Sequence, residues 1–292
     1  MNSVEQIIKE KIERIGTPLR DWNISINYGI KTGCNEAFII NEATKRELIA
    51  EDPKSEEIIR PILRGRDIKR FSFDFSNLYI IATFPSKKYS IEDYPAVKKH
   101  LLSFYKTELI DSGNEWVVSN YLSEFCFQKL SQTGKEIIID GKKIRNKQGQ
   151  IEKARKKTGN KWFETQDQIA YWDDFSKPKI IYREISDALD ACLDNSKILV
   201  NNKCYIVTGE HLPYLLCFLN SLLFSKILLP QANSTGGKGT DFLSKISLPI
   251  PSEQEDIKME YLLKEKDFKS IDNYFFEVFQ LGKDLINKLY TM

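Results

Sequence analysis

The clearest chemistry in the sequence is a cluster of cations around one glycine, in the segment LRGRDIKRF at positions 63–71. Gly65 lies at its centre, and Asp67 is the only acid. A guanidinium group is planar and permanently charged, so it can donate two hydrogen bonds at once to a phosphate or to the O6/N7 edge of guanine. The segment therefore predicts a basic turn that binds an anion or a base edge. Its candidate binding residues are Arg64, Arg66, Lys69 and Arg70.

A second glycine turn precedes this one, in NYGIKTGCNEAFII at positions 27–40. Gly29 and Gly33 bracket a polar stretch, and glycine allows positive φ and close approach of the backbone to a partner. The apolar residues on either side predict a hairpin of strand, tight basic turn and strand. Two such turns close in sequence predict one shared cationic rim. The candidate binding residues of this turn are Lys31, Thr32 and Asn35.

A third polar loop covers residues 231–241 and is rich in Gly, Ser and Thr. Its segment GGKGT resembles a phosphate-cradling loop, but Lys238 is followed by Gly239 rather than Ser or Thr, and a predicted helix precedes it. These departures argue against an ATP site, whereas a phosphate-touching or base-reading loop is consistent with them. A solvated turn is the structural alternative for each of the three loops. The candidates here are Asn233, Ser234, Lys238 and Thr240.

Positive charge also gathers in the middle of the chain, where residues 129–161 contain eleven Lys or Arg and three acids. Residues 136–139 and 142–145 predict the two arms of a hairpin, with Asp140-Gly141 as its turn. The polar stretch that follows predicts a loop or lobe that either follows a phosphate backbone or is a solvated insertion. The candidates are Lys142, Lys143 and Arg145, and a further cation, Arg183, lies in KPKIIYREI at 177–185.

One nuclease-like pattern occurs, because Asp140-Gly-Lys142 follows a predicted strand as the acid-x-Lys arm of metal-dependent nucleases does. An upstream acid such as Asp111 would have to complete it. Acid-x-Lys triplets are common in a lysine-rich chain, and Asp-Gly is an ordinary turn dipeptide, so the turn interpretation is favoured.

Composition limits the class of protein. The chain has 292 residues, 41% of them hydrophobic, and a net charge of +2, so affinity for nucleic acid has to come from local clusters of charge. Five scattered cysteines and two histidines argue against a disulfide framework and a structural zinc site, and predict a reduced, cytoplasmic protein. The longest apolar run, at 212–229, is interrupted by polar residues and predicts a buried helix rather than a membrane span.

The periodicity predicts helices and short strands without regular alternation of the two, which indicates a mixed α+β fold of small sheets supported by helices, with long helices near both termini. Aromatic residues at 162–175 are expected in the core. The expected helices cover 4–15, 41–50, 91–105, 210–229 and the tail after 253, and the expected strands include 73–83, 177–185, and a pair at 198–200 and 204–207.

The order of motifs resembles one family. GIKTGCNEAFI, ILRGRDIKRF, KPKIIYREI, LNSLL, GGKGTDF and LPIP follow one another as in the TaqI-like C-terminal specificity domain, over residues 22–252. That domain is the DNA target-recognition part of type IIG restriction-modification enzymes and related N6-adenine methyltransferases. The resemblance implies a connector helix at 1–20, a target-recognition domain at 21–252 with a basic insertion at 129–161, and a helical tail at 253–292.

The catalytic half of that architecture is not recognisable here. An amino methyltransferase of this kind needs an Asn/Asp-Pro-Pro-Tyr/Phe turn, and the sequence has no Pro-Pro pair and no Gly-rich turn suited to S-adenosylmethionine. The resemblance therefore implies a non-catalytic recognition chain whose partners are double-stranded DNA and a methyltransferase or endonuclease module. S-adenosylmethionine, and Mg²⁺ for any nuclease, would belong to that module. The alternatives are a stand-alone Mg²⁺-dependent nuclease and a scaffold that bridges subunits through its terminal helices.

Overall fold

The computed structural model describes residues 3–104, 106–110, 116–120, 137–139, 142–144, 159–184, 190–230 and 239–292. The chain forms two compact units, and each is made of segments distant in sequence. The fold is mixed α+β, as predicted. Unit 1 comprises Met1–Gly29, Leu63–Ser76 and Tyr171–Met292, and unit 2 comprises Ile30–Ile62 and Asn77–Ala170.

Unit 1 is built on a four-stranded antiparallel sheet in the order β13-β12-β15-β2. Side chains alternate between the two faces, and cross-strand neighbours share a face. Ile180 lies opposite Val207, which lies opposite Ile26, so one face is apolar across three strands. The strands are β2 (Ile24–Tyr28), β12 (Lys179–Arg183), β13 (Ala191–Asp194) and β15 (Cys204–Gly209).

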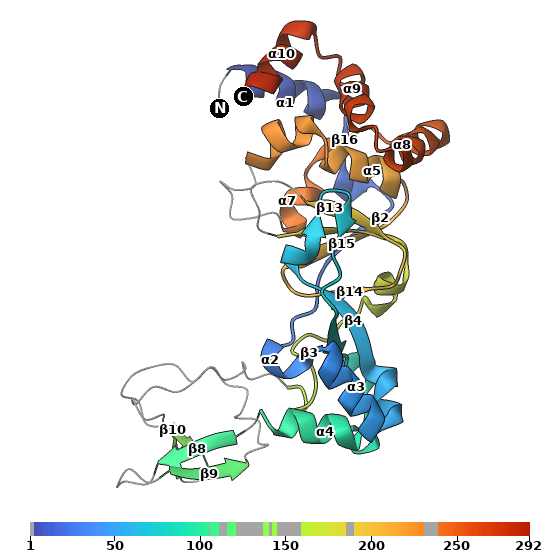
Figure 1. Cartoon of the computed structure of the whole chain (residues 1–292). Helices are drawn as coiled ribbons and strands as arrows, with labels where there is room; N and C mark the ends of the chain where they lie inside the picture. The colour runs from blue at the N-terminus through green and yellow to red at the C-terminus, as the bar shows by residue number, and fades with distance from the viewer. Residues whose placement is uncertain are drawn as a thin grey trace. The chain divides into compact units, whose positions relative to one another are not determined.

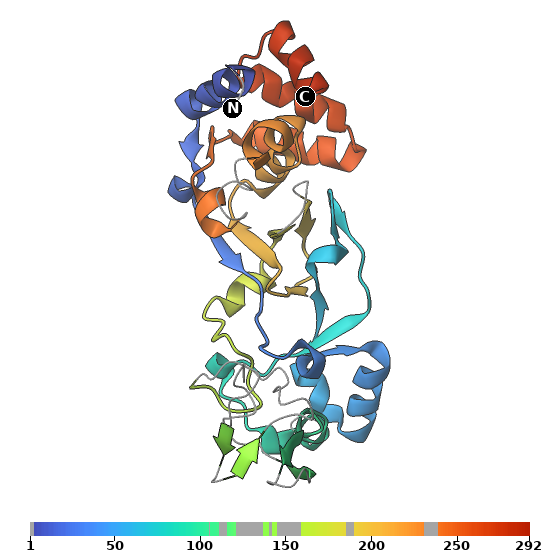
Figure 2. The same cartoon turned by 90° about the vertical axis from the view of Figure 1, so that its left-hand side faces the viewer.

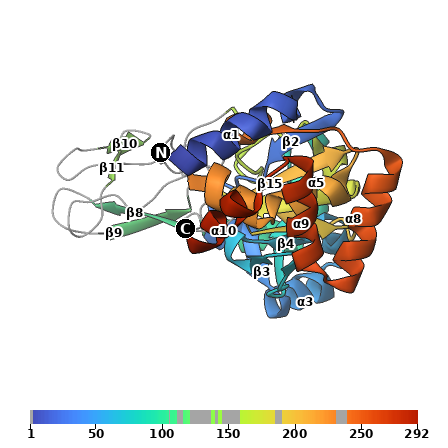
Figure 3. The same cartoon turned by 90° about the horizontal axis from the view of Figure 1, so that it is seen from above.

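Helices cover this apolar face. The helix α5 (Leu212–Leu219) is apolar on all sides and packs on β12, β13 and β15; the C-terminal helices α8 and α9 pack against α5, and α1 packs against α10 (Figures 1 and 3). In both side views α1 lies together with α5 and the C-terminal helices at one end of the sheet (Figure 2). The surrounding helices are α1 (Ser3–Ile15), α8 (Glu253–Glu265), α9 (Phe268–Val278) and α10 (Lys283–Thr291).

Short elements complete unit 1. Two pairs of short strands, β1 with β16 and β5 with β6, lie outside the main sheet. The elements are β1 (Thr17–Pro18), β16 (Ser247–Leu248), β5 (Ile68–Lys69), β6 (Ser72–Phe73), β14 (Leu199–Val200), α7 (Thr240–Ser244), the 3-10 turns η1 (Leu19–Asp21), η3 (Gly65–Asp67) and η7 (Trp172–Ser176), and the π-helix η8 (Phe224–Leu228).

Unit 2 has its own apolar core around an antiparallel sheet in which β7 pairs with β3 on one side and β4 on the other. A second sheet has the order β10-β11-β8-β9. The elements are α2 (Asn35–Phe38), β3 (Ile39–Asn41), α3 (Glu42–Glu51), η2 (Pro53–Ile58), β4 (Ile59–Leu63), β7 (Leu78–Ile81), η4 (Pro85–Lys87), η5 (Ile91–Asp93), α4 (Pro95–Leu102), β8 (Lys106–Ile110), β9 (Trp116–Asn120), β10 (Ile137–Ile139) and β11 (Lys142–Ile144).

Several predicted elements are confirmed. The first helix, the helix that Asn41 caps through the Thr44 N–H, and the tail helices are all present. The predicted hairpin arms pair as β10 and β11, although its turn residues Asp140 and Gly141 lie outside the described residues. Phe163 and Phe175 are buried, as expected for core aromatics. The domain boundaries proposed at 20/21 and 252/253 stay a prediction.

Three local predictions were wrong. The segment 27–40 is not a hairpin, because β2 pairs with β15 while the chain continues through α2 into β3 of the other unit. The strand at 198–200 does not pair with 204–207; β14 stays outside that sheet, and the Asn201 N–H donates to the Leu63 carbonyl. The predicted helix at 210–229 is interrupted at Asn220, after which the chain continues as the π-helix η8. Among the helices that the structure describes, none is long and apolar enough to cross a membrane.

Candidate nucleic-acid interface

The predicted basic turn in unit 1 is held by an ion pair within the turn itself. The Arg64 guanidinium donates to both carboxylate oxygens of Asp67, at 3.1 and 2.9 Å, and the Arg64 backbone N–H donates to the same group at 2.8 Å. The Ser76 hydroxyl adds a fourth hydrogen bond at 2.8 Å. Because Asp67 is 4% exposed, this carboxylate is a buried anchor on which the 3-10 turn η3 is built.

The charge state of Asp67 follows from these contacts. Burial alone would raise the pKa of its carboxyl group, but the hydrogen bonds from Arg64 and Ser76 and the positive charge of Arg64 outweigh burial. The pKa of Asp67 is therefore lowered, and the carboxylate stays ionised and bound to Arg64. Arg64 is thus used to hold the turn, which leaves other cations of the segment to meet a ligand.

Arg66 occupies the centre of the clamped turn and is exposed. In the described part of the chain, its guanidinium makes no hydrogen bond or ion pair. Lys69 is also exposed, and its ammonium group donates to the Arg66 carbonyl at 3.4 Å. The turn therefore presents two cations to solvent from a fixed backbone.

The turn lies against the ends of β12 and β15. A Cβ at Gly65 would be 3.1 Å from the Lys203 carbonyl oxygen and 3.7 Å from the Arg183 Cβ, so glycine allows the close approach. Arg183 forms an ion pair with Asp190, and Lys203 lies 3.5 Å from a carboxylate oxygen of Glu184. The sequence candidate Arg183 and the additional cation Lys203 thus lie beside the basic turn.

The described end of the third predicted loop reaches the same strand ends. The Tyr205 hydroxyl donates to Glu184 at 3.4 Å and would lie 3.5 Å from a Cβ at Gly239. The Tyr205 ring stacks on Tyr182 with ring centroids 5.2 Å apart. Burial, followed by the charge and hydrogen bond of Glu184, raises the pKa of Tyr205, so this phenol remains a neutral donor. Two of the three predicted loops therefore converge on the ends of β12 and β15.

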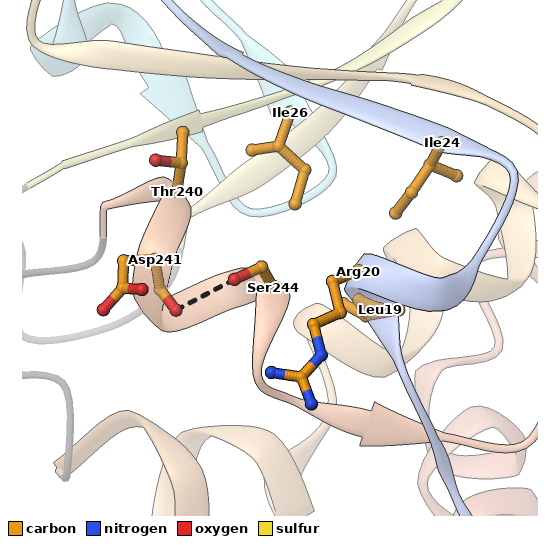
Figure 4. Close-up of a pocket in the computed structure, with 7 residues that line it drawn as sticks. All are labelled: Leu19, Arg20, Ile24, Ile26, Thr240, Asp241 and Ser244. Atoms are coloured by element: carbon orange, nitrogen blue, oxygen red, sulfur yellow. Dashed lines mark hydrogen bonds between the residues drawn. The ribbon is translucent and has the colours of Figure 1, made fainter.

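A pocket of about 390 Å³ opens beside the start of α7. Its apolar floor consists of Ile24 and Ile26 on the edge strand β2, together with Leu19 (Figure 4). Its polar rim is formed by Arg20 and by residues of α7, where the Ser244 hydroxyl donates to the Asp241 carbonyl at 3.0 Å. The predicted residue Thr240 lines this pocket. An apolar lining with a few polar groups is common in binding sites.

Arg70 has a role inside the fold. Its guanidinium donates two hydrogen bonds to the Asn220 carbonyl, at 3.1 and 2.6 Å, and lies 5.4 Å from the centre of the Phe268 ring. Asn220 is the residue at which α5 ends, so its carbonyl has no helical partner to accept from. Arg70 therefore satisfies a helix end. Its predicted contact with DNA stays a prediction.

The first predicted turn belongs to unit 2. Gly33 has a φ of 81°, the conformation expected of a glycine turn. Thr32 is buried, and its hydroxyl donates to the Asn35 side chain at 2.7 Å. Lys31 is exposed, and its carbonyl accepts from the Gln166 N–H at 3.1 Å. Thr32 thus shapes the turn, whereas Lys31 and Asn35 face solvent; the shared rim with the second turn stays a prediction.

Other candidates lie outside the described residues. These are Arg145, Asn233, Ser234 and Lys238, and of Lys142 and Lys143 the structure describes only the backbone, as part of β11.

The residues that the sequence did not reveal are Lys203, Tyr205 and Arg20. Lys203 follows the turn pair Asn201-Asn202, which is a local signal for an exposed cation at a strand end; Tyr205 and Arg20 carry no such signal. Within the described ranges, no three His, Cys, Asp or Glu side chains gather as ligands for a metal ion.

Comparison with known proteins identifies part of the chain. Residues 133–247 match the TaqI-like C-terminal specificity domain. The resemblance drawn from the order of motifs is confirmed over this range, which is shorter than the 22–252 covered by the motifs. The matched range includes β12, β13, β15 and α7, and hence the strand ends at which the two loops converge. No curated protein matches the chain.

Two solved structures are similar to the chain. The type IIL restriction-modification enzyme MmeI, solved in complex with DNA, has a TM-score of 0.50 and 12% identity, with 94% of this chain and 36% of that chain covered. The type IIG restriction endonuclease BpuSI has a TM-score of 0.48 and 14% identity, with 90% and 28% covered. At such low identity the likeness to MmeI concerns the fold alone. The chain spans about a third of the length of these enzymes.

Proposed function

Since residues 133–247 form a TaqI-like C-terminal specificity domain, we propose that this chain is the DNA target-recognition module of a restriction-modification system. It binds a defined sequence in double-stranded DNA. By doing so it positions one adenine for an N6-adenine methyltransferase module that this chain does not contain. The sequence lacks the Pro-Pro turn on which such a methyltransferase would stack the flipped base.

The observation that carries this proposal is the convergence of two glycine-containing loops on the ends of the two central strands, β12 and β15, of the sheet in unit 1. The turn of Arg66 contacts Lys203, just before β15, through Gly65, and Gly239 lies against the Tyr205 hydroxyl, which belongs to β15. Target recognition needs groups that hold phosphates and groups that read base edges. Exposed cations on a rigid turn suit the first task, and the polar rim of the pocket at Thr240 suits the second.

The chemistry of the system is assigned to the partner module. We propose that S-adenosylmethionine binds there, together with Mg²⁺ if a nuclease is present. The acid-x-Lys pattern of Asp140 and Lys142 remains the basis of the nuclease alternative, and it is tested by the Asp140→Ala variant. Cleavage of DNA by this chain with Mg²⁺, lost in that variant, would replace the recognition proposal.

The test is selection of bound duplexes from a random pool by the purified chain at rising salt, without Mg²⁺ or S-adenosylmethionine. A surface that contacts only phosphates loses affinity for all duplexes to the same extent as salt rises, because its affinity comes from the release of counterions. A recognition module keeps a consensus sequence that binds more tightly than the pool. Recovery of a pool with no consensus at every salt concentration would contradict the proposal.

A further inference from the structure

We propose that Arg66 and Lys203 together bind one backbone phosphate of the duplex, and that they set the register of the module on DNA without reading a base. This inference rests on the proposed function, and it assigns a role to Lys203, which the sequence did not mark as a site residue. The two residues come from segments distant in the chain, and the contact of Gly65 with the Lys203 backbone brings them together.

The backbone at Arg66 is fixed on both sides. Arg64 and Asp67, at the two ends of the turn, are joined by four hydrogen bonds, and Gly65 rests on the Lys203 carbonyl. The Asp74 N–H adds a bond to the Asp67 carbonyl at 2.8 Å. The position of the Arg66 Cα is therefore determined before DNA binds, so little backbone entropy is lost on binding.

The backbone at Lys203 is fixed as well. Its N–H donates to the Asn201 side chain at 3.1 Å, and its carbonyl accepts from the Glu184 N–H at 2.9 Å. The Lys203 side chain is 58% exposed, and its ammonium group lies 3.5 Å from Glu184. Exposed ion pairs of this kind contribute little free energy, so a phosphate can take the place of Glu184 at small cost.

The state of the Arg66 side chain favours a phosphate over a base. Reading a base edge requires a guanidinium whose orientation is fixed by neighbouring side chains. The structure describes no hydrogen-bond partner or ion-pair partner for the guanidinium of Arg66, so only its Cα is positioned. A phosphodiester accepts hydrogen bonds from many directions and tolerates this freedom. Lys203, whose backbone lies against Gly65, carries an ammonium group, a point charge that suits the same anion.

Three carboxylates around the turn already have partners other than Arg66. Asp67 is held by Arg64, and Asp190 forms its ion pair with Arg183. Glu184 is shared between Lys203 and the Tyr205 hydroxyl. Positive charge at Arg66 is therefore available to an incoming anion, and an exposed cation pair is the simplest site that a polyanion can occupy.

The experiment measures affinity for the selected consensus duplex and for an unrelated duplex, each as a function of salt, in Arg66→Ala, Lys203→Ala and the double variant. Each single variant should lower the affinity for both duplexes by the same factor. The consensus sequence that the variant selects should be the same as that of the unaltered chain. The double variant should lower the slope of log affinity against log salt by about one, which is the loss of one phosphate contact. Arg66→Lys should retain most of the affinity. Lys283→Ala, which removes an exposed cation of α10, is the matched control, and the urea midpoint of every variant checks folding.

Three results would overturn the inference. Loss of preference at one base pair in Arg66→Ala, with the salt slope unchanged, would make Arg66 a base reader. A fall in slope of about two in the double variant would place the residues on separate phosphates. No change in affinity would exclude both residues from the interface. If instead the unaltered chain binds all duplexes equally while the double variant still lowers the slope by one, the phosphate site stands and the proposed sequence recognition fails.

Discussion

Arg64 binds both carboxylate oxygens of Asp67, three residues further along the chain, and this ion pair turns a run of charged residues into a fixed structure. The four cations of the segment thereby acquire different roles. Arg64 holds the turn and Arg70 satisfies the end of α5, whereas the exposed side chains of Arg66 and Lys69 hold no helix end and no carboxylate among the described residues. Two cations of the segment thus stabilise the fold, and two are available to bind a ligand.

Replacement of Arg64 by alanine should destabilise unit 1. The Asp67 carboxylate is 4% exposed, and it would keep only the Arg64 backbone N–H and the Ser76 hydroxyl as donors. Removing one partner of a largely buried ion pair leaves a charge poorly compensated, and we expect a loss of about 2 kcal/mol in the free energy of unfolding. Urea denaturation measures this. Arg46→Ala is the control, because Arg46 is 77% exposed in its pair with Glu42 and should change stability by less than about 0.5 kcal/mol. Equal effects of the two variants would contradict the role of the Asp67 anchor.

The same carboxylate should give stability a defined pH dependence. Although burial opposes ionisation of Asp67, its hydrogen bonds lower its pKa below the ordinary value of 3.8. A carboxyl group whose pKa is lowered by folding stabilises the protein above its unfolded pKa, and that stability is lost as pH falls through the folded pKa. The difference in unfolding free energy between the unaltered chain and Asp67→Asn should therefore be constant from neutral pH to about pH 5 and shrink below pH 4. A difference that grows on acidification would show that the pKa is raised instead.

Alanine variants of Arg70 and Arg66 should affect different properties: Arg70→Ala should lower stability, and Arg66→Ala should weaken DNA binding. Arg70→Ala removes two charged hydrogen bonds to the Asn220 carbonyl at the end of α5, and we expect a loss of about 2 kcal/mol in unfolding free energy. The salt slope of DNA binding should stay unchanged, because this guanidinium is already engaged. Arg66→Ala should behave in the opposite way, with an unchanged urea midpoint and weaker binding. A fall in the salt slope of Arg70→Ala would instead support the contact with DNA that the sequence predicted for Arg70.

The sequence predicted the elements whose residues follow a clear period. The helical tail expected after residue 253 is present, and the structure shows that its first helix begins with a capping box of Ser252 and Glu255. The strand Lys179–Arg183 reads as a buried apolar run and lies inside the sheet. The glycines of the first turn were predicted to allow close approach of the backbone or positive φ. Gly29 shows the close approach, and Gly33 shows the positive φ.

Pairing between distant segments could not be predicted in the same way. Apolar residues on both sides of the turn at 29–33 favoured a local hairpin, but β2 found its partner in β15, where Ile26 meets Val207. Local periodicity shows which face of a strand is apolar, but it does not show which other strand will pair with it. The convergence of the basic turn on Lys203 and of Gly239 on Tyr205 depends on that long-range pairing. For this reason Lys203 and Tyr205 were missed.

Gly29 should be the least replaceable glycine of the interface. Its N–H donates to the Cys204 carbonyl at 2.8 Å, and a Cβ would lie 2.0 Å from the Asn201 carbonyl oxygen and 2.8 Å from that of Val200. The colliding atoms are backbone and cannot rotate away, so alanine must push the chain after β2 away from the backbone of Val200 and Asn201. We expect Gly29→Ala to lower the unfolding free energy by about 3 kcal/mol or more.

Gly159→Ala is the matched control for Gly29→Ala, because a Cβ at Gly159 would have no heavy atom of the described residues within 4 Å. Its stability should change by less than about 0.5 kcal/mol. Since β2 also carries Ile24 and Ile26, which form the floor of the pocket, Gly29→Ala should weaken sequence-specific binding more than a fall in folded fraction explains. Urea denaturation and duplex binding at saturating folded protein measure both effects. A stable Gly29→Ala protein with unchanged binding would show that the close approach of Gly29 to Asn201 is not needed for either.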